Sequence, residues 1–116
     1  MTIKGKIWGT TECVIQTPVF EKHRLEIKPG YQCSLHKHNR KWNSFTVISG
    51  QLFIDTVKPS KTVDTTTLGP GDSTTVPPGE YHRFRTGGQP CIATEEYYPD
   101  TLSEDIDRND EGGPVE

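Results

Sequence analysis

The stretch GYQCSLHKHNRKWNSFTVISG, residues 30–50, carries two histidines one residue apart inside a strand-like run. Successive side chains of a strand point to opposite faces, so Ser34, His36 and His38 share one face. The imidazoles of His36 and His38 then lie about 6 to 7 Å apart along the strand. That separation lets both side chains reach one metal ion, so this stretch predicts a strand that carries metal ligands.

A second stretch, GDSTTVPPGEYH at residues 71–82, ends in the histidine that completes the set. Its Gly and Pro residues supply turns that bring this part of the chain beside the first stretch. Neutral imidazole is a good ligand for divalent transition ions, and His82 with His36 and His38 gives three such ligands. We therefore predict one divalent transition ion per chain, Zn, Ni, Mn or Fe, at these three residues.

Outside the two stretches, the chain has the composition of an all-β domain. Its 116 residues include 15 Thr, 8 Ile and 7 Val but only 5 Leu, 1 Ala and 1 Met. β-branched residues favour sheets, whereas Ala, Leu and Met favour helices. Strand-like runs bounded by turn residues cover residues 6–16, 19–28, 31–38, 43–49, 51–57, 62–68, 72–76, 82–86 and 92–98. Nine short strands in a small chain predict one jelly-roll barrel made of two facing antiparallel sheets.

The chain is long enough for a single domain over residues 1–116, and we place its barrel at about residues 7–98. The remaining segment, residues 99–116, is acidic, because residues 95–116 hold nine acids and one base. Such a charge run is typical of a solvated surface segment. Within it, residues 103–106 either start one helical turn or stay extended.

Charge and apolar patterning exclude several classes of protein. No run of apolar residues exceeds three, so we expect neither a transmembrane segment nor a secretory signal, and no membrane partner. Cys13, Cys33 and Cys91 form no CxxC pair, which favours the reducing cytoplasm. The net charge is −3 and no dense basic face is present, which argues against a nucleic-acid partner.

The spacing of the histidines resembles the two signature motifs of the cupin superfamily. The first motif matches from Gly30 to Gly50 and the second from Gly71 to His82. The resemblance implies a double-stranded β-helix, that is, a jelly-roll barrel, with a divalent metal held by His36, His38 and His82. Asn43 stands where the first motif usually has a glutamate ligand.

Asn43 changes the expected charge of the site. A glutamate ligand would leave a divalent ion with a net charge of +1, whereas three neutral imidazoles and an amide leave it at +2. The ion is then a better host for an anionic ligand but is held more weakly. Asn43 either coordinates through its side-chain carbonyl oxygen or holds a metal-bound water, and we favour the water.

Several short segments look like the cupin domain of type II mannose-6-phosphate isomerases. They are residues 7–9, 27–30, 34–35, 45–50, 77–79, 82, 95 and 102–108. The resemblance implies a sugar-phosphate ligand, with Glu95 as an acid or base and Arg108 as an anion contact. A surface carboxylate and a tail salt bridge are the alternatives for these two residues. His23 falls on the inner face of its strand, where it either lines the pocket or hydrogen-bonds within the core.

Three functions stay open at this point. The first is a metal-dependent enzyme on sugars or sugar phosphates, favoured by the basic residues Arg40 and Lys41 beside the first motif. The second is a three-histidine non-haem iron enzyme of the dioxygenase kind, favoured by an apolar pocket lined by Trp42, Phe45 and Phe84. The third is a non-catalytic module that binds a small molecule.

We also predict a homodimer. Strand alternation places Cys33, Leu35 and Ile48 on the face opposite the histidines, where a monomer would leave them partly wet. Symmetric pairing is the commonest way to cover such a face.

Overall fold

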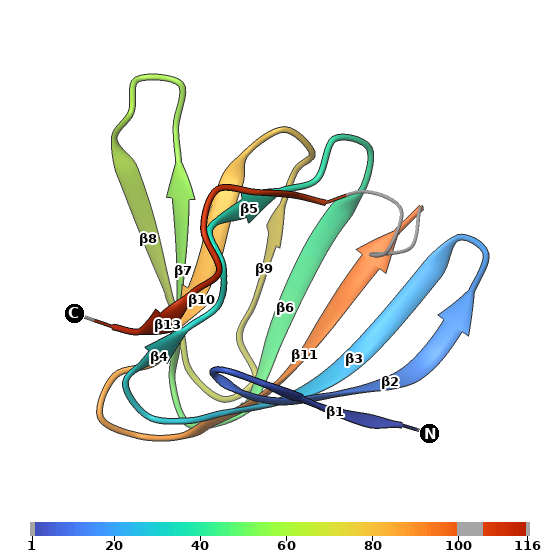
Figure 1. Cartoon of the computed structure of the whole chain (residues 1–116), viewed down its shortest axis with the longest axis vertical. Coiled ribbons are helices and arrows are strands. Elements are labelled where there is room, and N and C mark those ends of the chain that lie inside the picture. Colours follow the sequence, from blue (N-terminus) through green and yellow to red (C-terminus); the bar gives the residue numbers. More distant parts are fainter. Residues whose placement is uncertain (1, 100–105, 116) are drawn as a thin grey trace.

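The chain folds into two antiparallel sheets that face each other as the walls of a barrel (Figure 1). The computed structural model describes residues 2–99 and 106–115. One sheet has the order β1-β2-β3-β11-β6-β9; the other has the order β12-β5-β10-β4-β13, and β7 extends it by pairing with β10 and β8. The strands are β1 (Ile3–Lys6), β2 (Gly9–Thr17), β3 (Phe20–Ile27), β4 (Tyr31–Gln32), β5 (His36–Lys37), β6 (Trp42–Ser49), β7 (Leu52–Val57), β8 (Val63–Leu68), β9 (Ser73–Val76), β10 (Tyr81–Arg85), β11 (Cys91–Tyr98), β12 (Asp107–Arg108) and β13 (Gly113–Pro114).

The predicted fold class, an all-β jelly-roll barrel, is confirmed. Among residues 2–99 and 106–115 no helix forms, and none could therefore be long and apolar enough to cross a membrane. The core lies between the sheets and is built by alternation: Phe45 and Val47 of β6 point inward beside Ala93 of β11. Phe84 of β10 packs edge-on against Trp8 and Phe45, with ring centroids 4.9 and 6.1 Å away.

The predicted strand over residues 31–38 is wrong in one respect. Two short strands, β4 and β5, replace it, because residues 33–35 between them are not in a strand. The interruption breaks the alternation, so Cys33 and Ser34 are both buried. Cys33 therefore belongs to the core and not to an outer face, which removes one support for the homodimer. Ile48 is exposed as expected, and the homodimer stays a prediction.

The C-terminal segment lies at the surface, as its charge predicted, with residues 107–111 exposed, but it is also paired with the barrel. β12 pairs with β5 and β13 pairs with β4, so residues 106–115 run along the barrel (red beside teal in Figure 1). Asp110 accepts hydrogen bonds from the Leu35 backbone N–H and from Arg83, each at 2.8 Å. Charge complementarity with the barrel thus holds an acidic segment in place. The helical turn considered at residues 103–106 lies largely outside the described residues.

Gly50, between β6 and β7, gives a test of the backbone geometry. Its φ is +83°, and a Cβ there would lie 2.3 Å from the carbonyl oxygen of Pro90. We expect Gly50→Ala to lower the free energy of unfolding by about 3 kcal/mol, measured by urea denaturation. Gly71→Ala is the matched control, because Gly71 has a φ of +88° but open space around its Cβ position. Gly71→Ala should lower the free energy of unfolding by about 1 kcal/mol, the cost of the left-handed conformation alone. Equal decreases in the two variants would contradict the steric explanation.

Candidate metal centre

Three histidines converge inside the barrel where β5 meets β10. His36 and His82 are paired across these two strands, and His38 follows β5 on the same face. The ring centroids lie 4.6 Å apart for His36–His82, 5.0 Å for His36–His38 and 5.3 Å for His38–His82. All three rings are buried, and one nitrogen of each lies within 4.8 Å of one nitrogen of the others. The predicted set is thus brought together in a geometry that could hold a metal ion.

The hydrogen bonds of His36 leave one nitrogen aimed at this cluster without a partner. Its Nδ1 lies 2.8 Å from the carbonyl oxygen of Ser34, which can only accept, so Nδ1 carries the proton and donates. Nε2 then bears a lone pair, is buried and makes no hydrogen bond. Burial, with the nearby His82 and His38, lowers the pKa of His36 to about 2, so the ring is neutral. A buried, neutral imidazole with one fixed N–H and one free lone pair has the form of a metal ligand.

His82 and Asn43 place two acceptors against each other. His82 Nδ1 donates to the Glu80 carbonyl at 3.0 Å, and burial lowers the pKa of His82 to about 4, so its Nε2 bears a lone pair. That nitrogen lies 2.9 Å from Oδ1 of Asn43. The Asn43 amide cannot simply be turned over, because its Nδ2 donates to the Glu96 carbonyl at 3.3 Å and to the Glu95 side chain. A neutral imidazole donates only one hydrogen bond, so His82 cannot satisfy both of these acceptors, and a cation close to Nε2 and Oδ1 would relieve the contact. The three histidines and Oδ1 of Asn43 therefore fit a divalent cation.

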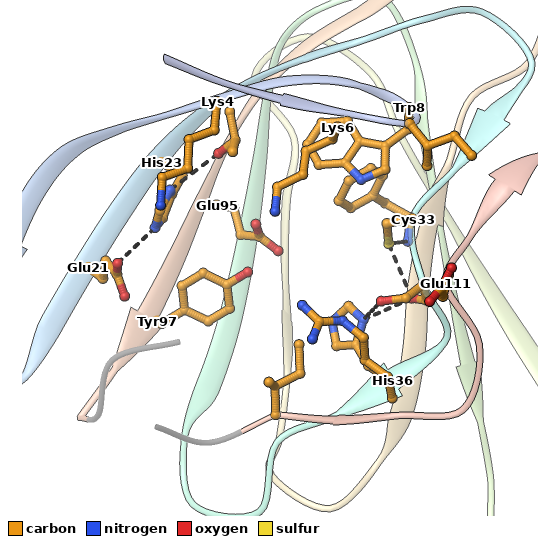
Figure 2. A pocket seen from close by; sticks show the side chains of 16 residues that line it. Lys4, Lys6, Trp8, Glu21, His23, Cys33, His36, Glu95, Tyr97 and Glu111 are labelled. Atoms are coloured by element: carbon orange, nitrogen blue, oxygen red, sulfur yellow. Dashed lines mark hydrogen bonds and ion pairs between the residues drawn. The ribbon is translucent and has the colours of Figure 1, made fainter. Parts of the chain in front are cut away.

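A cavity of about 480 Å³ opens beside His36, whereas His38, His82 and Asn43 do not line it. In Figure 2, Lys4 and Lys6 reach into it at one end, His36 lies at the other, and Glu95 and Tyr97 lie between them. The lining brings together five of the residues predicted for the site: His23, His36, Phe84, Glu95 and Arg108.

Three further predicted ligand contacts do not line this cavity. Arg40 is exposed in the turn after β5. Lys41 is 0% exposed, and its Nζ lies 4.8 Å from the centroid of the Tyr97 ring. Phe45 is a core residue whose ring centroid lies 6.3 Å from that of His82. Trp42 points outward and is 43% exposed, so it cannot form an apolar pocket wall.

The sequence reasoning missed other lining residues, among them Lys4, Lys6, Glu21, Tyr97 and Glu111. Alternation could have found Tyr97, two positions after Glu95, and Glu21, two positions before His23. Lys4, Lys6 and Glu111 carry no such signal, because they reach the cavity through the placement of β1 and of the C-terminal segment.

Glu95 is a buried carboxyl group beside the cluster. Burial raises its pKa to about 7, although hydrogen bonds from Tyr97 and Asn43 and the positive charge of Lys41 oppose this change. Both protonation states are therefore populated near neutral pH, which is a property of general acids and bases.

Burial changes the pH at which protons would compete with a metal ion for these ligands. Imidazoles with the ordinary pKa of about 6.5 would lose a metal below about pH 6. Because the pKa values of His36 and His82 fall to about 2 and 4, protons compete with a metal for these two nitrogens only at lower pH.

The same values predict how the stability of the metal-free protein depends on pH. Between pH 7 and 5 the unfolded state protonates its histidines, whereas folded His36 and His82 stay neutral, so stability falls as the pH falls. Glu95 acts in the opposite direction, because its folded pKa of about 7 lies above its ordinary value. Urea denaturation with chelator present should therefore show a steeper loss of stability in Glu95→Gln than in the wild type. If the free energy of unfolding of Glu95→Gln did not change between pH 7 and 5, this account would be wrong.

Comparison with known proteins agrees with this arrangement. The family model of the cupin domain matches residues 23–95, which is more than half of the chain. The chain is similar in fold to CapF in its complex with the inhibitor 3-isopropenyl-tropolone, with a TM-score of 0.80 and 18% identity over 91% of this chain and 33% of that one. It is also similar to oxalate decarboxylase from Bacillus subtilis, with a TM-score of 0.80 and 16% identity over 93% of this chain and 30% of that one. A third similar structure is KdgF from Halomonas sp., with a TM-score of 0.76 and 15% identity over 90% and 93% of the two chains.

The chain spans about a third of the length of CapF and of the decarboxylase. At these identities the three structures describe the fold alone, and no curated protein matches the chain in sequence. The match of the family model over residues 23–95 is what decides the assignment: the chain belongs to the cupin family.

Proposed function

We propose that this cupin holds one divalent transition ion with His36, His38 and His82 and binds a small anionic, sugar-like ligand in the adjoining cavity. The observation that carries the proposal is the buried Nε2 of His36, which has no hydrogen-bond partner and faces two further imidazoles. We assign Oδ1 of Asn43 as the fourth donor, instead of the metal-bound water that the sequence analysis favoured. The reason is that the Asn43 amide group is held with that oxygen toward His82. Hard ions prefer carboxylates, so a set of imidazoles and one amide suits Zn, Ni or Fe better than Mg or Ca.

The neutral donor set determines the charge that a ligand would meet. With three imidazoles and an amide, a bound divalent ion keeps its full charge of +2 and supplies Lewis-acid polarisation of a ligand oxygen. Lys4, Lys6 and Arg108 add positive charge to the cavity lining. Glu21, Glu95 and Glu111 provide acceptors for hydroxyl groups in the same cavity. A sugar phosphate or a sugar acid offers both kinds of group, and a phosphorylated sugar is the ligand class we propose.

Glu95 is the residue we assign to proton transfer. An aldose–ketose isomerisation moves a proton between neighbouring carbons, which requires a group that accepts it and then returns it. The Glu95 carboxyl lines the cavity and is oriented by hydrogen bonds from Tyr97 and Asn43. Lys6 extends toward it in Figure 2, so a bound anion and the carboxyl would lie side by side.

A three-histidine iron enzyme of the dioxygenase kind is the second candidate. The neutral donor set favours it, since such sites leave open positions on iron. Trp8 and Phe84 give the cavity an apolar wall, although Trp42 contributes nothing to it. Oxygen consumption that requires Fe²⁺ and no sugar phosphate would identify this function.

The metal ligands are tested by substitution. His82→Ala should bind one equivalent of Ni²⁺ less than the wild type in equilibrium dialysis, while its circular dichroism stays that of a sheet protein. Asn43→Glu should release the ion more slowly to a chelator, because it adds a negative donor. If His82→Ala and the wild type bind the same amount, the three histidines are not the site.

Ligand binding is tested with sugar phosphates such as mannose 6-phosphate on the Ni²⁺-loaded protein by calorimetry. Arg108→Ala should weaken binding about tenfold, as expected for the loss of a charge-assisted hydrogen bond. Arg40→Ala is the matched control, because Arg40 does not line the cavity, and its affinity should not change. Glu95→Gln should bind but not isomerise the sugar. Equal affinities of Arg108→Ala and wild type would contradict the assigned anion contact.

A further inference from the structure

A second group of metal-binding side chains lies on the inner face of β2 and β3, outside the three-histidine cluster. It consists of Cys13, Glu21 and His23, whose ligand atoms lie within 4.8 Å of one another. Cys13 of β2 is the cross-strand partner of His23 of β3, and Glu21 lies two residues earlier on the same face as His23. The register shifts between Cys13 and Ile15, so a bulge follows the cysteine before the pairing resumes at Ile15.

The surroundings of His23 are those of an oriented ligand. Its Nδ1 lies 3.2 Å from Oγ1 of Thr11, and its Nε2 lies 3.1 Å from a carboxylate oxygen of Glu21 (Figure 2). The His23 and Glu21 side chains are only 13% and 10% exposed. Metal-binding histidines commonly have their second nitrogen held by such a hydrogen bond, which fixes the ring.

We propose that Cys13, Glu21 and His23 form a second metal site, which takes a thiophilic divalent cation such as Zn²⁺. Thiolate, imidazole and carboxylate are the three kinds of zinc ligand, and the thiolate disfavours Mg²⁺ and Ca²⁺. The two negative ligands cancel the charge of the cation, so this site is neutral where the three-histidine site is +2. Three protein ligands leave a fourth position, and it faces the cavity because Glu21 and His23 line it.

The two metal clusters share no residue, and although Glu21 also lines the cavity of the proposed function, the second site is read from metal bound to sulfur and not from ligand binding. Tyr97 lies against both, with its ring centroid 5.9 Å from that of His23 and 5.4 Å from that of His38. An absorption band that arises only from metal bound to sulfur reports on the second site, even in variants that change the ligands of the three-histidine site.

The test is a Co²⁺ titration of the reduced protein, followed by the thiolate-to-cobalt charge-transfer absorption in the near ultraviolet. The wild type should develop this band to saturation at one equivalent of sulfur-bound Co²⁺, and Zn²⁺ should displace it. Cys13→Ser should abolish the band and lower the bound metal by one equivalent. Glu21→Gln and His23→Gln should each weaken the binding at least tenfold.

Two control variants keep the result interpretable. Cys91→Ser removes a buried thiol outside the cluster and should keep the band. His82→Ala should also keep the band, even if it loses the other metal ion, so failure of the three-histidine site and failure of this one are told apart. The proposal is overturned if the wild type shows no band, if Cys13→Ser retains it, or if His82→Ala loses it.

Discussion

The structure depends on how lone pairs are buried at the centre of the barrel. His36, His82 and Asn43 each direct an acceptor atom into one small volume, and their donor groups are all used elsewhere. An acceptor removed from water without a partner costs a few kcal/mol. A cation bound between them would meet all of these acceptors at once and would remove that cost. The pair that β5 makes with β10, His36 with His82, places two of these groups beside each other.

The set of candidate ligands lacks a carboxylate, and this draws attention to the carboxyl group of Glu95 nearby. Asn43 occupies the position where a carboxylate would neutralise part of the charge of the ion. Its Nδ2 donates to Glu95, so a carboxyl group lies one hydrogen bond away from the donor set. Lys41, buried beside the Tyr97 ring, contributes positive charge to the same region and favours the ionised form of Glu95. A carboxyl group is thus available on a side chain that lines the cavity, next to Asn43.

Most of the fold and the core of the candidate site could be predicted from the sequence, because both are matters of alternation and spacing. His36, His38 and His82 have fixed spacings from Gly and Pro residues, and the inward faces of β3 and β6 follow from period two. The failures come from places where alternation stops. The interruption between β4 and β5 buries the consecutive residues Cys33 and Ser34. Lys41, predicted as a ligand contact, is instead fully buried just before β6. The C-terminal segment is exposed as its charge predicted, but charge alone does not show that Asp110 pairs with Arg83 on the barrel.

The two donor clusters differ in a way that gives the cavity two electrostatic ends. Imidazoles and an amide leave a bound cation its full charge, whereas a thiolate and a carboxylate cancel it. An anionic ligand in the cavity would meet the Arg108 side chain near His36 and the Lys4 and Lys6 side chains at the other end (Figure 2). Tyr97 lies between the two clusters, with its ring near one histidine of each. Glu95 lies on the same face of β11 as Tyr97, so the carboxyl group to which we assign proton transfer also lies between the two clusters.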